Sequence, residues 1–367
     1  MRQTSLIAQH RAVGAKLVDF AGWEMPLQYT GVVEEYHTVR SEAGLFDVSH
    51  MGRIVVTGSG ADAFLQRMTT NDLAALKPMQ AQYSMLCNEE GGIKDDIFVY
   101  RLAGTGEFLL CVNASNRDKI VSWLTEHGRG CRDCRISDRS AEIAQIALQG
   151  SAARAIVAAL GLSQLNQLKL RESTIVRVAD AECLVARTGY TGEFGYEWYV
   201  YGPAAAVWER MLDVGTAFGL KPAGLGARDL LRLEMGYLLY GNDIDERTTP
   251  IEVGAEWVVG FNKGDFVGKS ALLAQKQTGL IRRFVGFELL EKGVPRHGFK
   301  ILSASARPSP VGEVTSGNLS PLLQKGIGLG YVSPEHAELG TDLFIDIRGK
   351  LVQAKVVKPP FYKRVAP

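Results

Sequence analysis

Two neighbouring acids, Asp95 and Asp96, lie in a stretch that otherwise reads as an internal β-strand. Aspartate is disfavoured inside strands, so an acid pair there suggests a chemical role. On a strand Asp96 shares one face with Phe98 and Tyr100, and Asp95 lies on the other. We expect one acid to face water and the other to enter a cleft, where a carboxylate beside aromatic rings suits a flat nitrogenous ligand. Two solvated acids on an edge strand would give the same pattern, and the pattern does not show which acid enters the cleft.

Two glycine-rich segments are further candidates for binding. Residues 187–197 place three glycines among aromatic and acidic side chains. Residues 222–229 form a turn that would present Arg228 at the start of a helix. Glycine lets the backbone approach a ligand closely. A hairpin turn and an ordinary helix N-terminus would explain the same residues.

Three other motifs predict no chemistry. Cys131 and Cys134 form a C-x-x-C motif, but the chain has no second one to complete a zinc site, and the motif leads into an expected strand, whereas redox motifs open a helix. Residues 264–270 are one residue short of a phosphate-binding loop. The Asp, Ser and His of residues 47–50 are too close in sequence to converge as a triad. The six histidines show no metal-ligand spacing, so we expect no metal site.

The composition is that of a compact globular protein, with 367 residues of which 46% are hydrophobic and 22% charged. This length corresponds to roughly two to three domains. The formal charge of +1 gives no reason to expect nucleic acid or an anionic membrane as a partner, and no apolar run is long enough to span a membrane. Five thinly spread cysteines and an N-terminus without a secretory signal predict a cytoplasmic protein.

A repeated pattern must position the candidate residues: an apolar strand, a turn of small residues and an amphipathic helix. It occurs four times, with helices expected over residues 61–69, around 120–124, over 152–160 and over 204–212. Strand pairs are expected between the copies, over 82–87 with 93–100 and over 173–178 with 182–186. This order is that of a split β-α-β, ferredoxin-like unit, and two such units fit into residues of about 50–220.

The pattern changes after about residue 282, where short alternating strands are separated by Gly, Pro and Ser clusters. These strands are expected over residues 283–289, 312–315, 327–332, 343–347 and 352–357. Such spacing predicts a small antiparallel sandwich or barrel. The chain should therefore be an α+β core followed by an all-β domain.

Taken together and in this order, these segments resemble the T-protein family of the glycine cleavage system, the tetrahydrofolate-dependent aminomethyltransferases. The matching segments cover nearly the whole chain: residues 18–27, 44–52, 91–96, 187–197, 222–229, 265–269, 315–317 and 358–362. The resemblance implies an α+β fold of two ferredoxin-like lobes and a C-terminal antiparallel β-barrel, three lobes around a central folate cavity. We expect residues 1–48 with 138–225 to form the first lobe, 49–137 with 226–280 the second, and 281–367 the barrel.

The resemblance also implies roles for individual residues. Asp96, the second Asp of a Gly-Gly-Ile-x-Asp-Asp segment, matches the catalytic acid. Glu197 matches the acid that recognises the pterin ring, and Arg228 matches the characteristic arginine of the family. Further folate contacts are expected from Tyr83, Asn113, Tyr190, Tyr100 and Met51.

The implied reaction passes a one-carbon unit from the aminomethyl-lipoyl arm of the H-protein to tetrahydrofolate, with release of ammonia and formation of 5,10-methylenetetrahydrofolate. The expected partner is therefore lipoylated H-protein, the co-substrate is tetrahydrofolate, and no metal is needed. A folate-dependent demethylase of the same superfamily is the alternative, but the Asp95–Asp96 pair and the lack of an oxidase domain favour the aminomethyltransferase. The iron–sulfur assembly proteins of the superfamily carry a reactive Cys that residues 187–192 lack.

Overall fold

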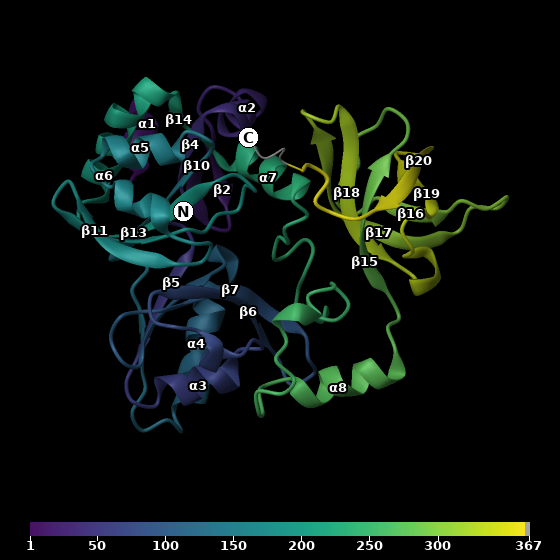
Figure 1. Ribbon diagram of the computed structural model, residues 1–367. Coiled ribbons are helices and arrows are strands. Elements are labelled where there is room, and N and C mark those ends of the chain that lie inside the picture. The colour runs from purple at the N-terminus through teal and green to yellow at the C-terminus, as the bar shows by residue number, and fades with distance from the viewer. Residues whose placement is uncertain (364–367) are drawn as a thin grey trace. The chain divides into compact units, whose positions relative to one another are not determined.

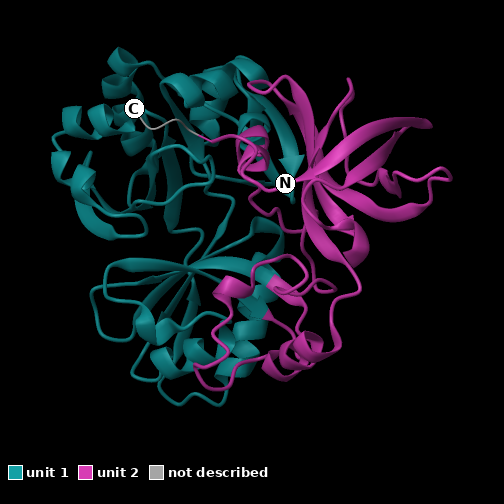
Figure 2. Cartoon of the chain, turned by 45° about the vertical axis from the view of Figure 1, so that its right-hand side comes forward, with its two compact units in different colours: residues 1–86, 95–228 teal, residues 87–94, 229–367 magenta. Residues whose placement is uncertain are grey.

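The computed structural model describes residues 1–363, which form open β-sheets flanked by helices and one closed β-barrel (Figure 1). Their contacts divide the chain into two units (Figure 2). The first unit holds residues 1–86 and 95–228, and the second holds residues 87–94 and the chain from 229 onwards. The turn between two strands of the first unit thus belongs to the second.

The first unit contains a six-stranded sheet in the order β11-β12-β13-β10-β4-β14. Its strands are β4 (Ala43–Asp47), β10 (Ile143–Gln149), β11 (Ser173–Val178), β12 (Ala181–Ala186), β13 (Gly195–Tyr201) and β14 (Leu220–Pro222). Helices α5 (Ala153–Ala159) and α6 (Ala204–Gly215) pack on this sheet. They do so because their apolar stripes, including Ile156 and Trp208, share one buried core with Leu148 and Trp198 of the strands.

A second sheet of five strands has the order β6-β7-β8-β5-β9. Its strands are β5 (Gly52–Thr57), β6 (Gln80–Cys87), β7 (Ile93–Arg101), β8 (Glu107–Val112) and β9 (Arg135–Asp138). Helices α3 (Ala61–Met68) and α4 (Arg117–Gly128) lie along one side of it (Figure 1). Tyr100 and Leu109 of this sheet share a core cluster with Leu184 and Tyr199 of the six-stranded sheet, so the two sheets pack together.

The N-terminal residues add a small three-stranded sheet, β1-β3-β2, to the first unit. Its strands are β1 (Arg2–Gln3), β2 (Lys16–Phe20) and β3 (Trp23–Gln28). Helix α1 (Ile7–Ala12) lies between β1 and β2 on the chain, and helix α2 (Val32–Ser41) follows β3.

The second unit ends in a closed barrel in the order β15-β18-β17-β16-β19-β20. Its strands are β15 (Arg283–Leu289), β16 (Lys300–Ser303), β17 (Pro310–Ser320), β18 (Lys325–Val332), β19 (Asp342–Ile347) and β20 (Lys350–Val357). Alternate side chains, among them Phe287, Ile301 and Val352, fill its interior. Helix α7 (Leu225–Glu234) leads from the first unit into the second, and α8 (Lys269–Thr278) precedes the barrel.

The predicted fold class is confirmed: the protein is mixed α+β, and its C-terminal part is a closed antiparallel barrel. The boundaries of the three lobes and the central cavity stay predictions, and residues 364–367 of the expected barrel domain lie outside the described residues. Within residues 1–363, no helix has the length and apolar character that crossing a membrane requires. The cytoplasmic location stays a prediction from the sequence.

Candidate functional site

Asp96 lies on β7 and receives hydrogen bonds from a residue within β6 and from one just after β8. The Tyr83 hydroxyl on β6 donates to Oδ2 of Asp96 over 2.9 Å, and the Asn113 amide just after β8 donates to Oδ1 over 2.8 Å. Burial and then the nearby Asp96 charge raise the pKa of Tyr83 well above its ordinary value, so the phenol stays protonated and donates. The carboxylate is therefore fixed in one orientation.

Asp95 is fully buried and Asp96 is partly buried, so neither acid is the fully solvated one that the strand pattern led us to expect. It accepts hydrogen bonds from the Asn113 backbone N–H at 3.0 Å and from the Asn113 and Asn116 side-chain amides at 2.8 and 2.7 Å. Its face of β7 is the interior one, shared with Ile97, whereas Asp96 is only partly buried. Burial and then the Asp96 charge raise the pKa of Asp95 to about 7. Asp95 is thus a buried support for Asp96 and not a surface acid.

A row of aromatic rings leads away from Asp96. The ring centroids of Tyr83 and Phe98 lie 5.5 Å apart, those of Phe98 and Tyr100 6.3 Å, and those of Tyr100 and Tyr199 5.0 Å. Since Tyr199 lies on β13, this row connects the five-stranded sheet with the six-stranded one. It provides flat, partly polar side chains of the kind that aromatic ligands stack on.

Glu197 lies on β13 at the other end of this row, where its side chain is buried and held from two directions. The Thr188 hydroxyl donates to Oε2 over 2.5 Å, and the Gln145 amide donates to Oε1 over 3.3 Å. Gln145 is directly opposite Tyr199 in the β10–β13 ladder, and Tyr100 contacts the Thr188 hydroxyl over 3.3 Å. Each carboxylate oxygen therefore has one protein donor and keeps the capacity to accept a second.

Arg228 lies in the first turn of α7 and over the ring of Tyr190, with 4.6 Å between its Cζ and the ring centroid. Its Nη1 is buried and has no hydrogen-bond partner among residues 1–363. Burial and then the Arg228 charge lower the pKa of the neighbouring His50 to about 3, so that imidazole is neutral and adds no competing charge. A buried cationic N–H without an acceptor is suited to an acceptor on a ligand.

The loop that carries Tyr190 is fixed by buried polar contacts. Arg40 of α2 forms a 2.8 Å ion pair with Glu193 and donates to the Thr191 carbonyl. Gln149 accepts from the Thr191 hydroxyl over 2.8 Å, and a Cβ at Gly189 would lie 2.0 Å from Gln149 Oε1. A side chain at position 189 would therefore have to displace the buried amide of Gln149.

The structure brings the predicted site residues together in the first unit. Asp96, Tyr83 and Asn113 are in direct contact, and Tyr190 is close enough to Tyr83 to influence its ionisation. The remaining predicted residues are connected through shared neighbours. Glu197 and Tyr100 both contact the Thr188 hydroxyl, and Arg228 lies over the Tyr190 ring. Met51 packs against the core cluster that contains Tyr100. Sequence reasoning missed Asn116, Gln145 and Thr188. Only Asn116 had a signal, since it follows Asn113 by three residues at the end of a strand.

The motifs set aside in the sequence have structural roles, with one exception. Asp47 is buried against His10 and Thr4, and Lys269 donates to the Gly264 carbonyl in the turn before α8. The exception is the C-x-x-C motif, which forms a disulfide.

Known proteins are similar to this chain over nearly its whole length. Two family models match, the GCVT N-terminal domain over residues 6–263 and the glycine cleavage T-protein C-terminal barrel domain over residues 282–363. The aminomethyltransferase of Halothermothrix orenii is 45% identical over 362 residues, which cover 98% of this chain and 100% of that protein. The aminomethyltransferase of Bacillus subtilis is 44% identical over 370 residues, covering 99% and 100%. The crystal structure of glycine cleavage system aminomethyltransferase T from Bartonella henselae has a TM-score of 0.91 at 36% identity and covers 98% of both chains. The chain belongs to the aminomethyltransferase family, the T-proteins of the glycine cleavage system.

Proposed function

We propose that this aminomethyltransferase takes the one-carbon unit from the aminomethyl-lipoyl arm of the H-protein and transfers it to tetrahydrofolate. One observation carries the proposal: two carboxylates held by protein donors, Asp96 and Glu197, are linked by a row of aromatic rings. A pterin is flat and rich in N–H donors, so it suits stacking on rings and hydrogen bonding to carboxylates. The products are ammonia, 5,10-methylenetetrahydrofolate and the dihydrolipoyl arm.

Glu197 is the proposed pterin-binding acid. Thr188 and Gln145 each donate to one of its two oxygens and so set the plane of the carboxylate. The remaining lone pairs of the two oxygens can accept two parallel N–H bonds from the amino and imide edge of the pterin. The neutral donors on the protein side leave the negative charge of Glu197 available to the ligand.

Asp96 is the proposed catalytic residue. As the carbon forms bonds to the folate nitrogens, it leaves its sulfur and its amino nitrogen, and positive charge develops on the one-carbon unit. A carboxylate beside it accepts the proton of the attacking nitrogen and balances that charge. Tyr83 and Asn113 hold Asp96 in place for both tasks.

The other predicted residues complete the proposed folate site. Tyr190, Tyr100 and Met51 supply flat or apolar walls, and the unpaired Nη1 of Arg228 is available to an acceptor on the substrate. No residue of this set needs a metal ion for its role.

Reconstitution tests the proposal directly. The full chain is mixed with aminomethyl-lipoyl H-protein, and ammonia release is followed with and without tetrahydrofolate. We expect folate to accelerate the release, with one methylenetetrahydrofolate formed per ammonia. Ammonia release at the same rate with and without tetrahydrofolate would contradict the proposal. One-carbon transfer from a small methylated amine without H-protein would instead support the demethylase alternative.

A further inference from the structure

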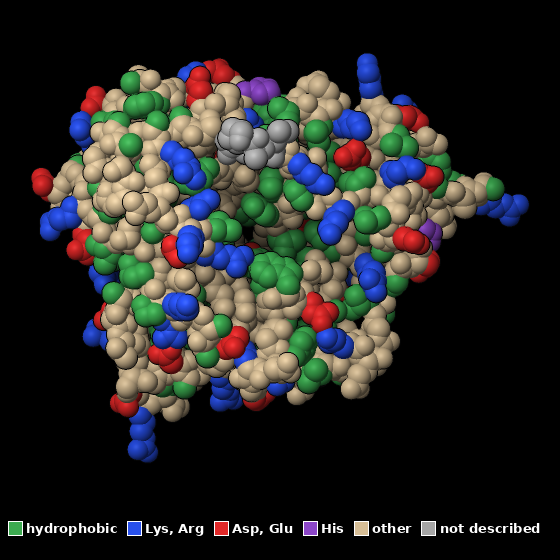
Figure 3. Space-filling model, viewed as in Figure 1, with side chains coloured by type: hydrophobic (Ala, Val, Ile, Leu, Met, Phe, Trp, Pro, Cys, Tyr) green, Lys and Arg blue, Asp and Glu red, His purple; other side chains and the backbone are tan. Residues whose placement is uncertain are grey.

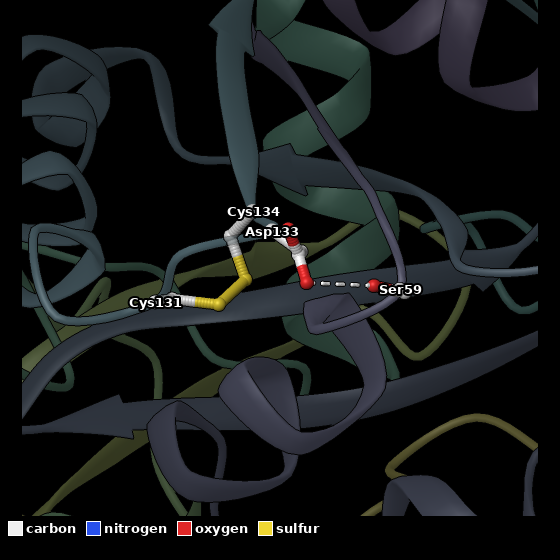
Figure 4. Close-up of a disulfide and its surroundings, with 4 residues drawn as sticks. All are labelled: Ser59, Cys131, Asp133 and Cys134. Atoms are coloured by element: carbon white, nitrogen blue, oxygen red, sulfur yellow. Dashed lines mark hydrogen bonds between the residues drawn. A yellow bond between two sulfur atoms is a disulfide. The ribbon is translucent and has the colours of Figure 1, made fainter.

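The disulfide between Cys131 and Cys134 is outside the proposed folate site. The two cysteines lie on the turn between α4 and β9, with 5.4 Å between their Cα atoms (Figure 4). This turn lies beside the C-terminal end of β5, whereas Met51 immediately precedes the N-terminal end of that strand. A six-residue strand spans about 20 Å, which separates the turn from Met51. A reaction at the two sulfurs is therefore separate from chemistry at Asp96.

These two cysteines differ from the other three in exposure. Cys131 and Cys134 are partly exposed, whereas Cys87, Cys111 and Cys183 are buried. Burial raises the pKa of the Cys87 and Cys183 thiols to about 12 and that of Cys111 to about 11. Because the thiolate is the reactive form, the three buried cysteines are protected from disulfide exchange.

The turn is held against the loop that begins α3. The Ser59 hydroxyl donates to the Asp133 carboxylate over 3.2 Å (Figure 4). The Gly60 amide donates to the Asp133 carbonyl over 3.3 Å. A Cβ on Gly60 would lie 2.6 Å from Cys131 Sγ and 3.1 Å from Cys134 Sγ. The backbone at Gly60 thus closes one side of the sulfur pair and keeps both sulfurs on a short, fixed turn.

The charge around the pair is positive. Arg129 and Arg132 are exposed on this turn and Arg135 is exposed at the start of β9, and Asp133 is the single acid between Arg129 and Arg135. Positive charge favours the thiolate form of a cysteine and attracts an anionic reaction partner. Exposed disulfides are also the ones that thiols reduce most readily.

We propose that Cys131 and Cys134 form a reversible thiol–disulfide exchange site whose oxidant is an anionic low-molecular-weight disulfide of the glutathione class. One cysteine thiolate attacks the disulfide of oxidised glutathione, which gives a mixed disulfide and releases one glutathione thiolate. The second cysteine thiolate then attacks the protein sulfur of the mixed disulfide, forms the Cys131–Cys134 bond and releases the second glutathione. The two protons lost by the cysteines go to the two glutathione thiolates, so the cysteine pair is oxidised by two electrons and the glutathione disulfide is reduced by two.

The test is an equilibrium titration of the native full chain in mixtures of reduced and oxidised glutathione. In each sample the thiol–disulfide exchange is quenched, free thiols are alkylated without unfolding the protein, and the mass of the intact protein is measured. We expect two alkyl groups per chain in excess reduced glutathione, none in excess oxidised glutathione, and one transition between these limits. Two alkyl groups in every mixture, or none in any, would overturn the proposal, as would modification at any of the three buried cysteines in place of the pair.

Single variants trap the intermediate and provide the control. Cys131→Ser and Cys134→Ser each leave one thiol on the turn, so each should accumulate one glutathione per chain in excess oxidised glutathione. Cys183→Ser removes a buried thiol and should keep the two-alkyl transition of the parent. If neither single variant gains glutathione while Cys183→Ser shows no transition, the turn does not exchange disulfides. None of these measurements uses the aminomethyl transfer, so their outcome does not depend on whether the proposed function is correct.

Discussion

The Asp96 carboxylate is the side chain whose change should affect the chemical step most. Asp96→Asn keeps the size of the side chain but removes its charge and its basicity. We expect the rate of methylenetetrahydrofolate formation at saturating substrates to fall by about 10²–10⁴-fold, the usual loss with a general base. Asp118→Asn is the control, since Asp118 is exposed on α4 and pairs with Arg2 at the surface. Activity of Asp96→Asn within a few-fold of the parent would remove Asp96 from the mechanism.

Thr188 should act on folate binding through Glu197. Thr188→Val keeps the shape of the side chain but removes the hydroxyl that donates to Glu197 Oε2. Hydrogen bonds to charged groups contribute about 1.5–3 kcal/mol, so folate affinity should weaken by about 10–150-fold, with a much smaller change in rate at saturating folate. Thr188→Ser keeps a hydroxyl and should restore most of the affinity. Equal weakening by Val and Ser would show that Thr188 acts only through packing.

Asp95 should make stability depend on pH. Its pKa is raised from an ordinary value of about 3.9 to about 7, so between these pH values the folded protein binds more protons at this site than the unfolded chain. The contribution of Asp95 to the free energy of unfolding therefore falls as pH rises from about 4 to about 7. Asp95→Asn cannot titrate at this position. When both proteins are unfolded in urea, the free energy of unfolding of the parent minus that of the variant should fall over this pH range. A difference that is constant with pH would contradict the assignment.

The loop between β12 and β13 depends on a buried ion pair. The side chains of Arg40 and Glu193 are 4% and 1% exposed, and Arg40 also binds the Thr191 carbonyl. Arg40→Met leaves the Glu193 charge buried without this partner, which typically costs about 3–5 kcal/mol of unfolding free energy. Arg139→Met breaks the exposed pair with Glu142 and should cost much less. Equal losses in chemical denaturation would show that the buried pair does not stabilise this loop.

Local patterns predicted most elements because the spacing of apolar residues differs between a helix and a strand. The helix expected over 61–69 is α3, and the strand expected over 283–289 is β15. The strand β16 was not predicted, because four residues are too short to show an alternation. The sequence did not show which of Asp95 and Asp96 is buried, because both faces of β7 carry apolar or aromatic residues and the alternation does not reveal which face is interior.

The contacts that position the site are long-range, and no local pattern contains them. Asp95 is buried against Asn113 and Asn116 of a later strand end, and Glu197 is held by Gln145, which is 52 residues away in sequence. The types of Asp96 and Glu197 indicated chemistry, but their supporting donors are ordinary polar residues. Only the pairing of β10 with β13 and of β7 with β8 makes those donors neighbours of the acids.

The near-neutral balance of charge over the whole protein is compatible with binding a partner. On the face shown in Figure 3, basic and acidic side chains are interspersed, in keeping with the formal charge of +1. A lipoyl-carrying protein can dock on a local patch, and folate is anionic at its glutamate tail. Neither needs a globally basic surface, so the composition gives no electrostatic reason to expect nucleic acid and is compatible with an acidic protein as partner.

The division of the chain into two units predicts that one glycine is critical for the second unit. The turn of residues 87–94 lies between β6 and β7 but belongs to the second unit, where Lys94 pairs with Glu246 over 3.1 Å and the Ile93 amide donates to the Thr248 carbonyl over 2.8 Å. A Cβ at Gly92 would lie 1.9 Å from the Glu246 carbonyl oxygen, a backbone atom that cannot move aside by changing rotamer. Gly92→Ala must therefore push this turn away from residues 246–248. We expect the free energy of unfolding to fall by about 1–3 kcal/mol and the amides of Ile93 and nearby residues to exchange faster with deuterium. Gly130→Ala is the control, because a Cβ there meets nothing within 4 Å. If the two variants were equally stable and equally protected, residues 87–94 would not be held by the second unit.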